Sequence, residues 1–426
     1  RPMLSRRQML RQILETSLSL PLGSMLAGAL LQGQNPAAPA NPSAPVNNSP
    51  ITTLSAEDDQ FLNDVESASF QFFWEQGSPN TGMVKDRCNL RNPNQISAAS
   101  IAATGFGLTA LCIGDQRKFI PSAAALERVF ATLRFLWRKL PNHRGFFFHF
   151  AHPETGERMY DSEVSSVDTA ILLCGVISCR EHFRHRAVAE LANLILNRVD
   201  WSWLAEDTSL LTHGWTPEVG FLSSRWDYYS ELMMMYLLAM GAAQRPLPAD
   251  IWNAWKRLTF EYDGMRYIGS FAPLFVHQYS QAWFDFRNKR DKYADYFQNS
   301  VTATEVHRRF CLELRQQFPD YSEELWGITA SDSQRGYVVW GGPPAMGPID
   351  GTVVPSAAGG SLPFLPAESL RVLKTMRSKY PSSWTKYGFV NAFNPLKNWY
   401  DSDVIGIDTG IALLMAENLR TGFVWD

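Results

Sequence analysis

The sequence predicts an all-α protein whose helices form a toroid, with an inner and an outer layer around one axis. Two kinds of helical segment support this fold class. Some are amphipathic, with one apolar stripe and one charged face, whereas others are apolar on nearly every side and rich in Ala, Gly, Ser and Thr. The two kinds alternate along the chain, and roughly six such pairs would fill it after residue 55. A stack of helical repeats is the alternative, although no motif of fixed period supports it.

The amphipathic segments are the predicted outer helices. The first begins after Ser55, which precedes three acids in a capping pattern, and it ends at Gly77. A stripe of apolar residues at helical spacing recurs over residues 122–140, 187–199 and 366–377. Each segment keeps one charged face, so we place all four on the outside of the toroid.

The apolar segments are the predicted inner helices. They cover residues 97–113, 165–178, 229–241 and 404–417. Their small side chains would let neighbouring helices approach closely, which suits elements that are buried on most sides. We therefore place these segments in the inner ring.

Long loops rich in Gly, Pro and aromatic residues connect the helices. Residues 145–150 and 336–340 are strand-like and predict small hairpins within these loops. The loops over residues 77–96, 201–227 and 261–299 are expected to close or open the ends of a cleft.

The first 54 residues predict export rather than a folded element. Residues 5–10 read Ser-Arg-Arg-Gln-Met-Leu, which resembles a twin-arginine export signal. We assign residues 1–31 to this signal and residues 32–54, rich in Pro, Ala and Asn, to a linker. The apolar stretch is too short to span a bilayer, so we expect a periplasmic or extracellular protein without stable membrane insertion. A basic N-terminal helix is the alternative.

The composition suits a large packed domain with a neutral partner. The chain of 426 residues has 39 Lys and Arg against 42 Asp and Glu, a net charge of −3. This balance argues against a nucleic-acid partner. Aromatic residues reach 13% and charged residues only 19%. These values fit a protein that binds a neutral, hydroxyl-rich ligand, and they fit an aromatic core equally well.

The sequence contains no recognisable metal or nucleotide motif. The five cysteines and eight histidines lack the spacing of a metal finger, and no Gly-rich phosphate loop follows a strand-like run. We therefore expect no metal and no cofactor.

Carboxylates gather where three of the apolar helices begin. They are Asp161, Glu163 and Asp168; Asp227 and Glu231; and Asp401, Asp403 and Asp408. Helix capping explains such acids in part, because a carboxylate at a helix start stabilises it by roughly 0.3–1 kcal/mol. Glu163 and Glu231 are harder to explain in this way, because uncharged stretches follow them and a carboxylate entering an apolar helix is costly without partners.

Paired carboxylates beside aromatic rings are what the hydrolysis of a glycosidic bond requires. One carboxyl group protonates the leaving oxygen, while the other activates water or attacks the anomeric carbon. Trp and Tyr faces offer apolar platforms for sugar rings, although core packing is the alternative for any single ring. The residue types therefore predict a carbohydrate-active enzyme.

Several motifs, in matching order over roughly residues 55–426, resemble the glycoamylase-like domain family. They are Glu163-Val-Ser-Ser-Val-Asp168-Thr169, Tyr229-Ser230-Glu231-Leu232, Trp326-Gly-Ile-Thr-Ala-Ser-Asp332, Asp350-Gly-Thr-Val-Val-Pro355, Asn391-Ala-Phe-Asn-Pro395 and Ile405-Gly-Ile-Asp408-Thr409-Gly410. The resemblance implies an (α/α)6 toroid with long loops and minor β-hairpins. It also implies metal-independent activity on β-1,2-glucan, as an endo-β-1,2-glucanase or an enzyme that releases sophorose.

Carried over position by position, the resemblance assigns catalytic roles to Glu163, Glu231 and Asp408. Two positions depart from the family pattern, with Val167 where Ile is usual and Thr409 where Gln is common. Neither departure removes a carboxylate. The acids and rings beside these positions are the predicted substrate contacts. They are Asp161, Asp168, Trp226, Asp227, Tyr229, Trp326, Asp332, Trp399 and Asp401.

Other functions remain open from the sequence. A β-1,2-glucan transglycosylase would use the same carboxylates. A polysaccharide lyase on a helical toroid and a non-catalytic glycan-binding protein are alternatives from other classes. We expect a monomer whose partner is a neutral glucan. The sequence leaves open endo or exo action, the stereochemical outcome, and which carboxylate is the acid.

Overall fold

The computed structural model describes residues 53–340 and 349–426. The predicted signal and nearly all of the linker lie outside these residues. The first described helix, α2 (Ala56–Gln76), begins where the capping pattern predicts, since the Asp58 amide donates to Ser55 Oγ at 3.0 Å. It ends at Gly77, as predicted. No helix within the described ranges combines the length and the apolar character needed to cross a membrane.

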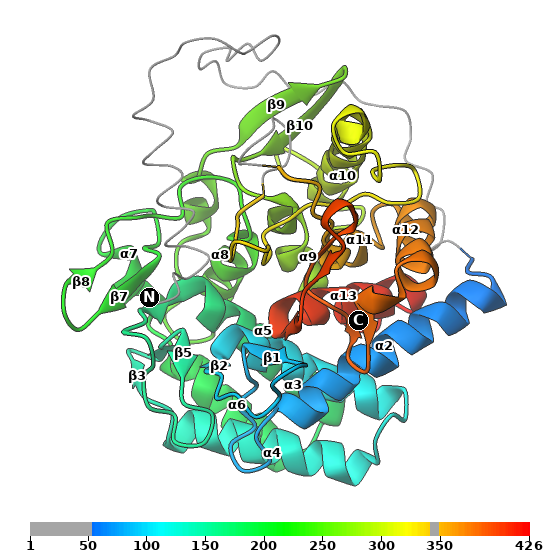
Figure 1. Ribbon diagram of the computed structural model, residues 1–426. Helices are drawn as coiled ribbons and strands as arrows, with labels where there is room; N and C mark the ends of the chain where they lie inside the picture. Colours follow the sequence, from blue (N-terminus) through cyan, green and yellow to red (C-terminus); the bar gives the residue numbers. More distant parts are fainter. Residues whose placement is uncertain (1–52, 341–348) are drawn as a thin grey trace.

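An inner ring of helices forms the centre of the molecule (Figure 1). Its members are α3 (Ile101–Gln116), α5 (Ser166–Phe183), α8 (Met233–Met240), α9 (Tyr279–Trp283), α11 (Pro355–Gly359) and α13 (Gly406–Arg420). Packing contacts join α3 to α5, α5 to α8 and α8 to α9. They also join α11 to α13, and α13 to α3. Beside α9, Gln278 Nε2 donates to Ala357 O of α11 at 3.0 Å, so the ring is closed.

A second layer of helices covers the inner ring. It consists of α2, α4 (Ser122–Arg138), α6 (Arg186–Arg198), the short 3-10 helix η1 (Ala249–Asn253), α10 (Tyr296–Glu313) and α12 (Pro366–Lys379). Here η1 takes the outer position beside α8. In Figure 1, α4, α10 and α12 lie at the periphery and α5, α9 and α13 lie nearer the centre. The predicted (α/α)6 toroid is confirmed, with amphipathic helices outside and apolar helices inside.

The closest approach of two inner helices occurs between α3 and α5. A Cβ on Gly105 would lie 2.5 Å from Ile171 O, and one on Gly175 would lie 2.2 Å from Gly105 O. Real Cβ atoms do not come so close to backbone, so these two positions require glycine. The abundance of small residues in the apolar segments thus has the predicted physical cause.

Short antiparallel strands lie in the loops, and three of those described, β2, β6 and β15, directly precede the inner helices α3, α5 and α13. The paired strands are β1 (Arg87–Asn89) with β15 (Asp403–Ile405); β2 (Ala99–Ser100) with β5 (Phe150–Ala151); β3 (Asn142–His143) with β4 (Phe146–Phe147); β6 (Val164–Ser165) with β7 (Gly214–Thr216), and β7 with β8 (Gly220–Phe221); β9 (Leu258–Tyr262) with β10 (Met265–Gly269); β11 (Trp384–Thr385) with β12 (Gly388–Phe389); and β13 (Phe393–Asn394) with β14 (Trp399–Tyr400). The remaining short helices are α7 (Trp201–Ala205), η2 (Leu274–His277), η3 (Leu314–Gln316), η4 (Pro381–Ser383) and η5 (Pro395–Lys397).

Three local predictions need correction. The predicted loop over residues 261–299 contains β10, η2, all of α9 and the start of α10. Residues 336–340 form no hairpin strand and make only the isolated bridge between Ser331 and Val338. The inner helix predicted over residues 229–241 begins at Met233, because the preceding residues form turns.

Candidate active site

Three inner helices begin at the same end of the toroid because strands tie their starts together. Arg87 pairs with Ile405 just before α13, and Ser100 pairs with Phe150 just before α3. A further bridge joins Phe148 to Val164, just before α5. We call this end the mouth. Here the sequence predicted that the carboxylates would meet.

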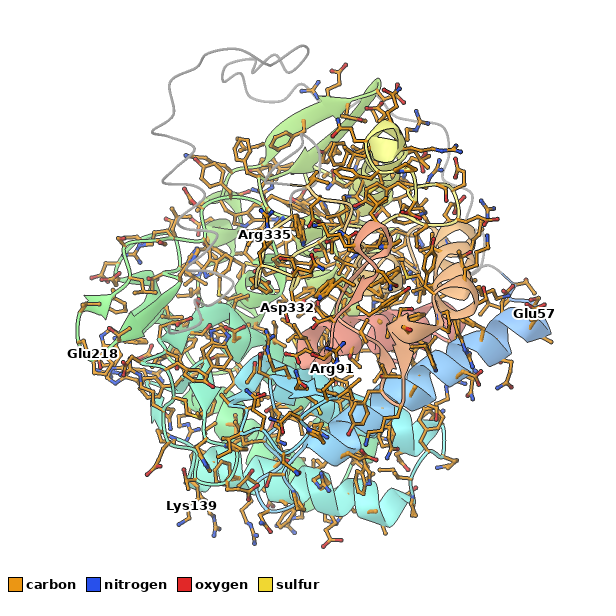
Figure 2. The ribbon with its side chains drawn as sticks, in the orientation of Figure 1. Glu57, Arg91, Lys139, Glu218, Asp332 and Arg335 are labelled. Atoms are coloured by element: carbon orange, nitrogen blue, oxygen red, sulfur yellow. The ribbon has the colours of Figure 1, made fainter. Side chains whose placement is uncertain are left out.

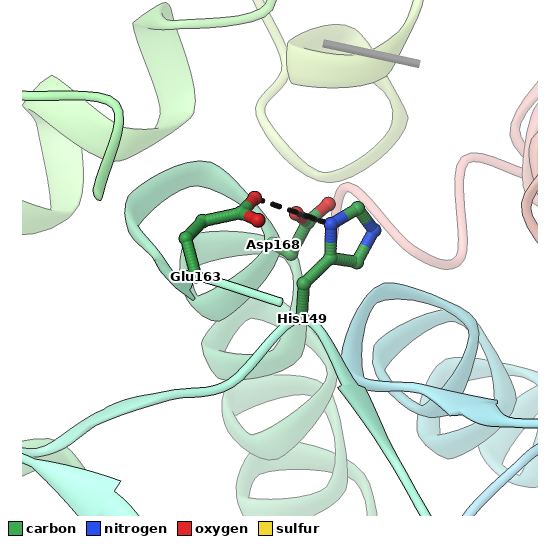
Figure 3. Close-up of side chains that lie close together, drawn as sticks. All are labelled: His149, Glu163 and Asp168. Atoms are coloured by element: carbon green, nitrogen blue, oxygen red, sulfur yellow. Dashed lines mark hydrogen bonds and ion pairs between the residues drawn. The ribbon is translucent and has the colours of Figure 1, made fainter. Parts of the chain in front are cut away.

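A compact group of His149, Glu163 and Asp168 lies at the mouth beside the start of α5 (Figure 3). His149 Nδ1 is 3.2 Å from Glu163 Oε1 and 3.6 Å from Asp168 Oδ2. All three residues are buried, with exposed fractions of 7–8%. An imidazole between two carboxylates can hold or pass a proton, which is the property that acid–base catalysis uses.

Local sequence fixes each member of this group. Ser165 caps α5, since its Oγ donates to Asp168 Oδ2 at 2.6 Å and accepts from the Asp168 amide at 3.2 Å. The His149 amide donates to Glu163 O at 2.9 Å, which holds the two chain segments in register. The ring of Phe150 stacks on the imidazole with centroids 3.9 Å apart. The group is therefore held in place from three sides.

A second network of polar residues links the start of α13 to β1. Asn391 Nδ2 donates to Asp408 Oδ2 at 2.8 Å, and its Oδ1 accepts from the Asp332 amide at 2.7 Å. Asp332 Oδ2 in turn accepts from Arg87, 2.6 Å away, which also contacts Asp403 at 3.1 Å. The carboxylate of Asp408 thus has a fixed orientation, and Ser356 Oγ donates to its other oxygen at 3.2 Å.

Asp401 lies beside this network and has an unusual protonation state. Burial, followed by the neighbouring charges of Asp332 and Asp403, raises the pKa of Asp401 to about 8. At neutral pH it is therefore largely a neutral acid that can donate a hydrogen bond. Asp401 also lines a cavity of about 330 Å³ together with Trp399 and Tyr400. Asp332, Arg335 and Arg91 lie near the centre of the view in Figure 2.

The acids predicted at the start of α8 lie in the turns before the helix. Glu231 is 7% exposed, and its backbone oxygen accepts from Ser280 Oγ at 2.9 Å. Burial raises the pKa of Asp227, which lies four residues earlier. Glu231 is therefore a buried carboxylate that does not cap α8, since Leu232 occupies the cap position.

The predicted aromatic platforms separate into two kinds. Tyr229 and Trp326 are completely buried, and the hydroxyl of Tyr229 lies 3.1 Å from His277 Nδ1. Neither ring has an exposed face in this structure, so their contact with substrate stays a prediction. Trp226 is 5% exposed, and its indole donates to Ser166 Oγ at 2.8 Å. Trp399 lines the cavity and is the candidate whose position suits a sugar contact.

Some functional candidates could not be found by sequence reasoning. His149 follows a run of three Phe whose pattern predicts a loop hairpin, and Arg87 lies in a predicted loop. Asn391 belongs to one of the motifs that resemble the family, so this motif is a sequence signal that points to Asn391 as a site residue. Asp161, by contrast, is exposed and has a left-handed backbone with φ of 48°. The structure brings Glu163 and Asp168 together, and it leaves Asp161 on the surface.

The fold and the sequence both match known proteins. Residues 223–426 match the family model described as "Glycoamylase: Putative glucoamylase". Over these residues the chain is similar to the glycoamylase-like family. The solved structure of an endo-β-1,2-glucanase from Chitinophaga pinensis, in complex with sophorotriose and glucose, superposes with a TM-score of 0.80 at 27% identity. The match covers 87% of this chain and 94% of that one. The resemblance predicted from the sequence motifs is confirmed.

Two further relatives come from Parabacteroides distasonis. One is named "Exo beta-1,2-glucooligosaccharide sophorohydrolase (non-reducing end)" and is 28% identical over 415 residues. The alignment covers 88% of this chain but only 57% of that relative's length. The other, a solved β-1,2-glucanase, has a TM-score of 0.80 at 26% identity, over 86% of this chain and 57% of that one. This chain thus spans a little over half the length of these two relatives.

Proposed function

We propose that this protein is a glycoside hydrolase that cleaves β-1,2-glucan. The observation that carries the proposal is the group of His149, Glu163 and Asp168, which is buried at the mouth of the toroid. The relatives named for β-1,2-glucan activity support the substrate class. The near-neutral charge of the chain also suits a neutral polysaccharide.

In the proposed reaction, carboxyl groups supply both proton transfers. One carboxyl group protonates the glycosidic oxygen as the bond to the anomeric carbon breaks, and a second removes a proton from the attacking water. Glu163, Glu231 and Asp408 are our candidates for these two roles. Asn391 and Ser356 orient Asp408, whereas His149 and the backbone at β6 orient Glu163. Trp399 and Asp401 in the neighbouring cavity would contact a sugar unit.

Incubation with linear β-1,2-glucan tests the proposal. Product sizes resolved over time distinguish the modes of action, because a ladder indicates endo cleavage and sophorose alone from the start indicates exo cleavage. The anomeric form of the first product reports retention or inversion. Products longer than the substrate would instead indicate transglycosylation, and an unsaturated product would indicate a lyase. Binding without any product would refute hydrolysis.

Separate Glu163→Gln and Glu231→Gln variants test the catalytic roles. Each should fold normally and lose about 10²–10⁴-fold in kcat, because general acid–base catalysis contributes that much. Glu190→Gln is a matched control, since Glu190 lies on the outer helix α6 and pairs with Arg186. The leaving group of an activated aryl sophoroside departs without being protonated. This substrate should therefore restore the rate of the variant that lacks the general acid, and not that of the variant that lacks the other carboxylate. Wild-type turnover in either variant would remove that residue from the mechanism.

We also propose that the protein is exported as a monomer to the periplasm or the extracellular space. The twin-arginine-like segment within residues 1–31 supports export, although it lies outside the described residues. Cell fractionation tests the location of the protein. It compares cells that produce the full chain with cells that produce an Arg6→Lys/Arg7→Lys variant. Export is refuted if the wild-type protein stays in the cytoplasm, and equal export of both proteins would exclude Arg6 and Arg7 as the export signal. Sedimentation of the purified protein tests the monomer.

A further inference from the structure

The same three residues that flank the proposed reaction centre also have the geometry of a metal site. His149 Nδ1, one oxygen of Glu163 and one of Asp168 lie within 4.8 Å of one another. They come from three places in the chain, namely the segment between β4 and β5, the residue before β6, and the first turn of α5 (Figure 3). Sequence spacing could not reveal the group, because the strand pairing at the mouth brings it together.

The separations of His149 Nδ1 from the two carboxylates are compatible with a tetrahedral Zn²⁺. Two ligands that each lie about 2.1 Å from a tetrahedral Zn²⁺ are about 3.4 Å apart. The observed separations from His149 Nδ1 are 3.2 Å to Glu163 and 3.6 Å to Asp168. These two values bracket the ideal one, and all three donor atoms lie within 4.8 Å of one another.

The donor set also selects among the common divalent cations. An imidazole nitrogen with two carboxylate oxygens suits Zn²⁺, whereas Mg²⁺ and Ca²⁺ prefer oxygen ligands alone, and Ca²⁺ takes 6–8 of them. Two carboxylates would balance the charge of the ion. Ser165 and the Asp168 amide already orient Asp168, which lowers the cost of ordering that ligand.

We propose that Zn²⁺ or a similar transition-metal ion binds to His149, Glu163 and Asp168 and reversibly inhibits the enzyme. The ion takes the lone pair of His149 Nδ1 and one oxygen lone pair from each of Glu163 and Asp168, and any proton on these atoms is released to solvent. It thereby occupies a carboxylate that the proposed hydrolysis requires. The inhibitory effect rests on the proposed function, whereas binding of the metal does not.

Two measurements on the full chain, freed of metal with a chelator, test this proposal. Calorimetric titration with Zn²⁺ should show one equivalent bound. Co²⁺ should give the intense visible absorption of a four-coordinate ion, in which water completes the coordination. Both signals should be lost or weakened at least about tenfold in His149→Asn, which removes the nitrogen ligand. His185→Asn is the matched control, because His185 is exposed at the start of α6 and should leave both signals unchanged.

A second variant keeps the test decisive if His149→Asn fails to fold. Glu163→Gln removes a different ligand and should weaken Zn²⁺ binding to a similar extent. Equal affinity in wild type and in either folded variant would overturn the site. Glucan hydrolysis that Zn²⁺ does not slow would overturn the inhibition. If the chain binds Zn²⁺ but hydrolyses no β-1,2-glucan, the proposed function fails and the metal site stands.

Discussion

A buried cluster of charges between α2, α3 and α13 makes the stability of the toroid sensitive to pH. Arg117 forms two hydrogen bonds to Glu417, at 2.7 and 3.0 Å, and Arg420 contacts both Glu66 and Asp59. Glu66 is completely buried. Three carboxylates facing two guanidinium groups leave one excess negative charge, which a single bound proton would remove.

We assign this proton to Glu66, which has no exposed surface. Burial, followed by the charge of Glu417, raises the pKa of Glu66 from 4.5 to about 8. The folded state therefore binds a proton that the unfolded chain releases above its lower pKa. The contribution of this proton to the free energy of unfolding is greatest below about pH 4.5 and is lost as the pH rises through about 8. Over this window, one such group changes the free energy of unfolding by about 1.4 kcal/mol for each pH unit.

The Glu66→Gln variant should remove this dependence, because the amide resembles the neutral acid and does not titrate. Urea denaturation followed from about pH 6 to pH 8 should show that wild type loses roughly 2 kcal/mol more than the variant. Glu190→Gln, on the exposed face of α6, should behave like wild type. Parallel curves for wild type and Glu66→Gln would refute the assignment of the proton to Glu66.

Three further predictions concern packing, capping and the cavity. Gly105→Ala should lower the free energy of unfolding by about 1–3 kcal/mol, because the added Cβ would lie 2.5 Å from Ile171 O. A variant that is as stable as wild type in a denaturant titration would contradict this close approach. Ser165→Ala should lower the free energy of unfolding by about 1 kcal/mol, because the α5 cap is lost, and it should lower kcat by releasing Asp168. Thermal melts measure the first effect and kinetics the second. An unchanged melting temperature would exclude a stabilising role for the cap. Asp401→Asn should remove an ionisation near pH 8 from the pH profile of kcat/KM, and a profile that keeps it would exclude Asp401 as its source.

Much of the fold could be predicted because helix periodicity records burial directly. Ser55 and Gly77 mark the ends of α2 correctly, and the small-residue segments correspond to inner helices. The hairpin of β9 and β10 and the short helix α9 could not be predicted. They lie in a segment whose apolar residues follow no long period, and only tertiary contacts hold α9 in the ring.

The candidate site could be predicted only in part, because sequence shows which residues are available but not which ones meet. Glu163 and Asp168 are five residues apart, so their proximity was accessible. His149 joins them through strand pairing, which depends on backbone register rather than on residue type. Sequence also does not show which way an aromatic ring faces. A ring at the edge of an apolar segment can face either the substrate or the core, and the rings of Tyr229 and Trp326 are both buried in the core.

The pairing of β1 with β15 has a consequence for how the protein is made. Arg87 meets Ile405 across more than three hundred residues, and α13 contacts both α2 and α3. Contacts of such long sequence separation slow folding, because a long loop must close before they form. During synthesis, no growing chain can complete the mouth until α13 has left the ribosome. Until then the nascent protein carries an open ring with exposed apolar edges, and such surfaces are prone to aggregation.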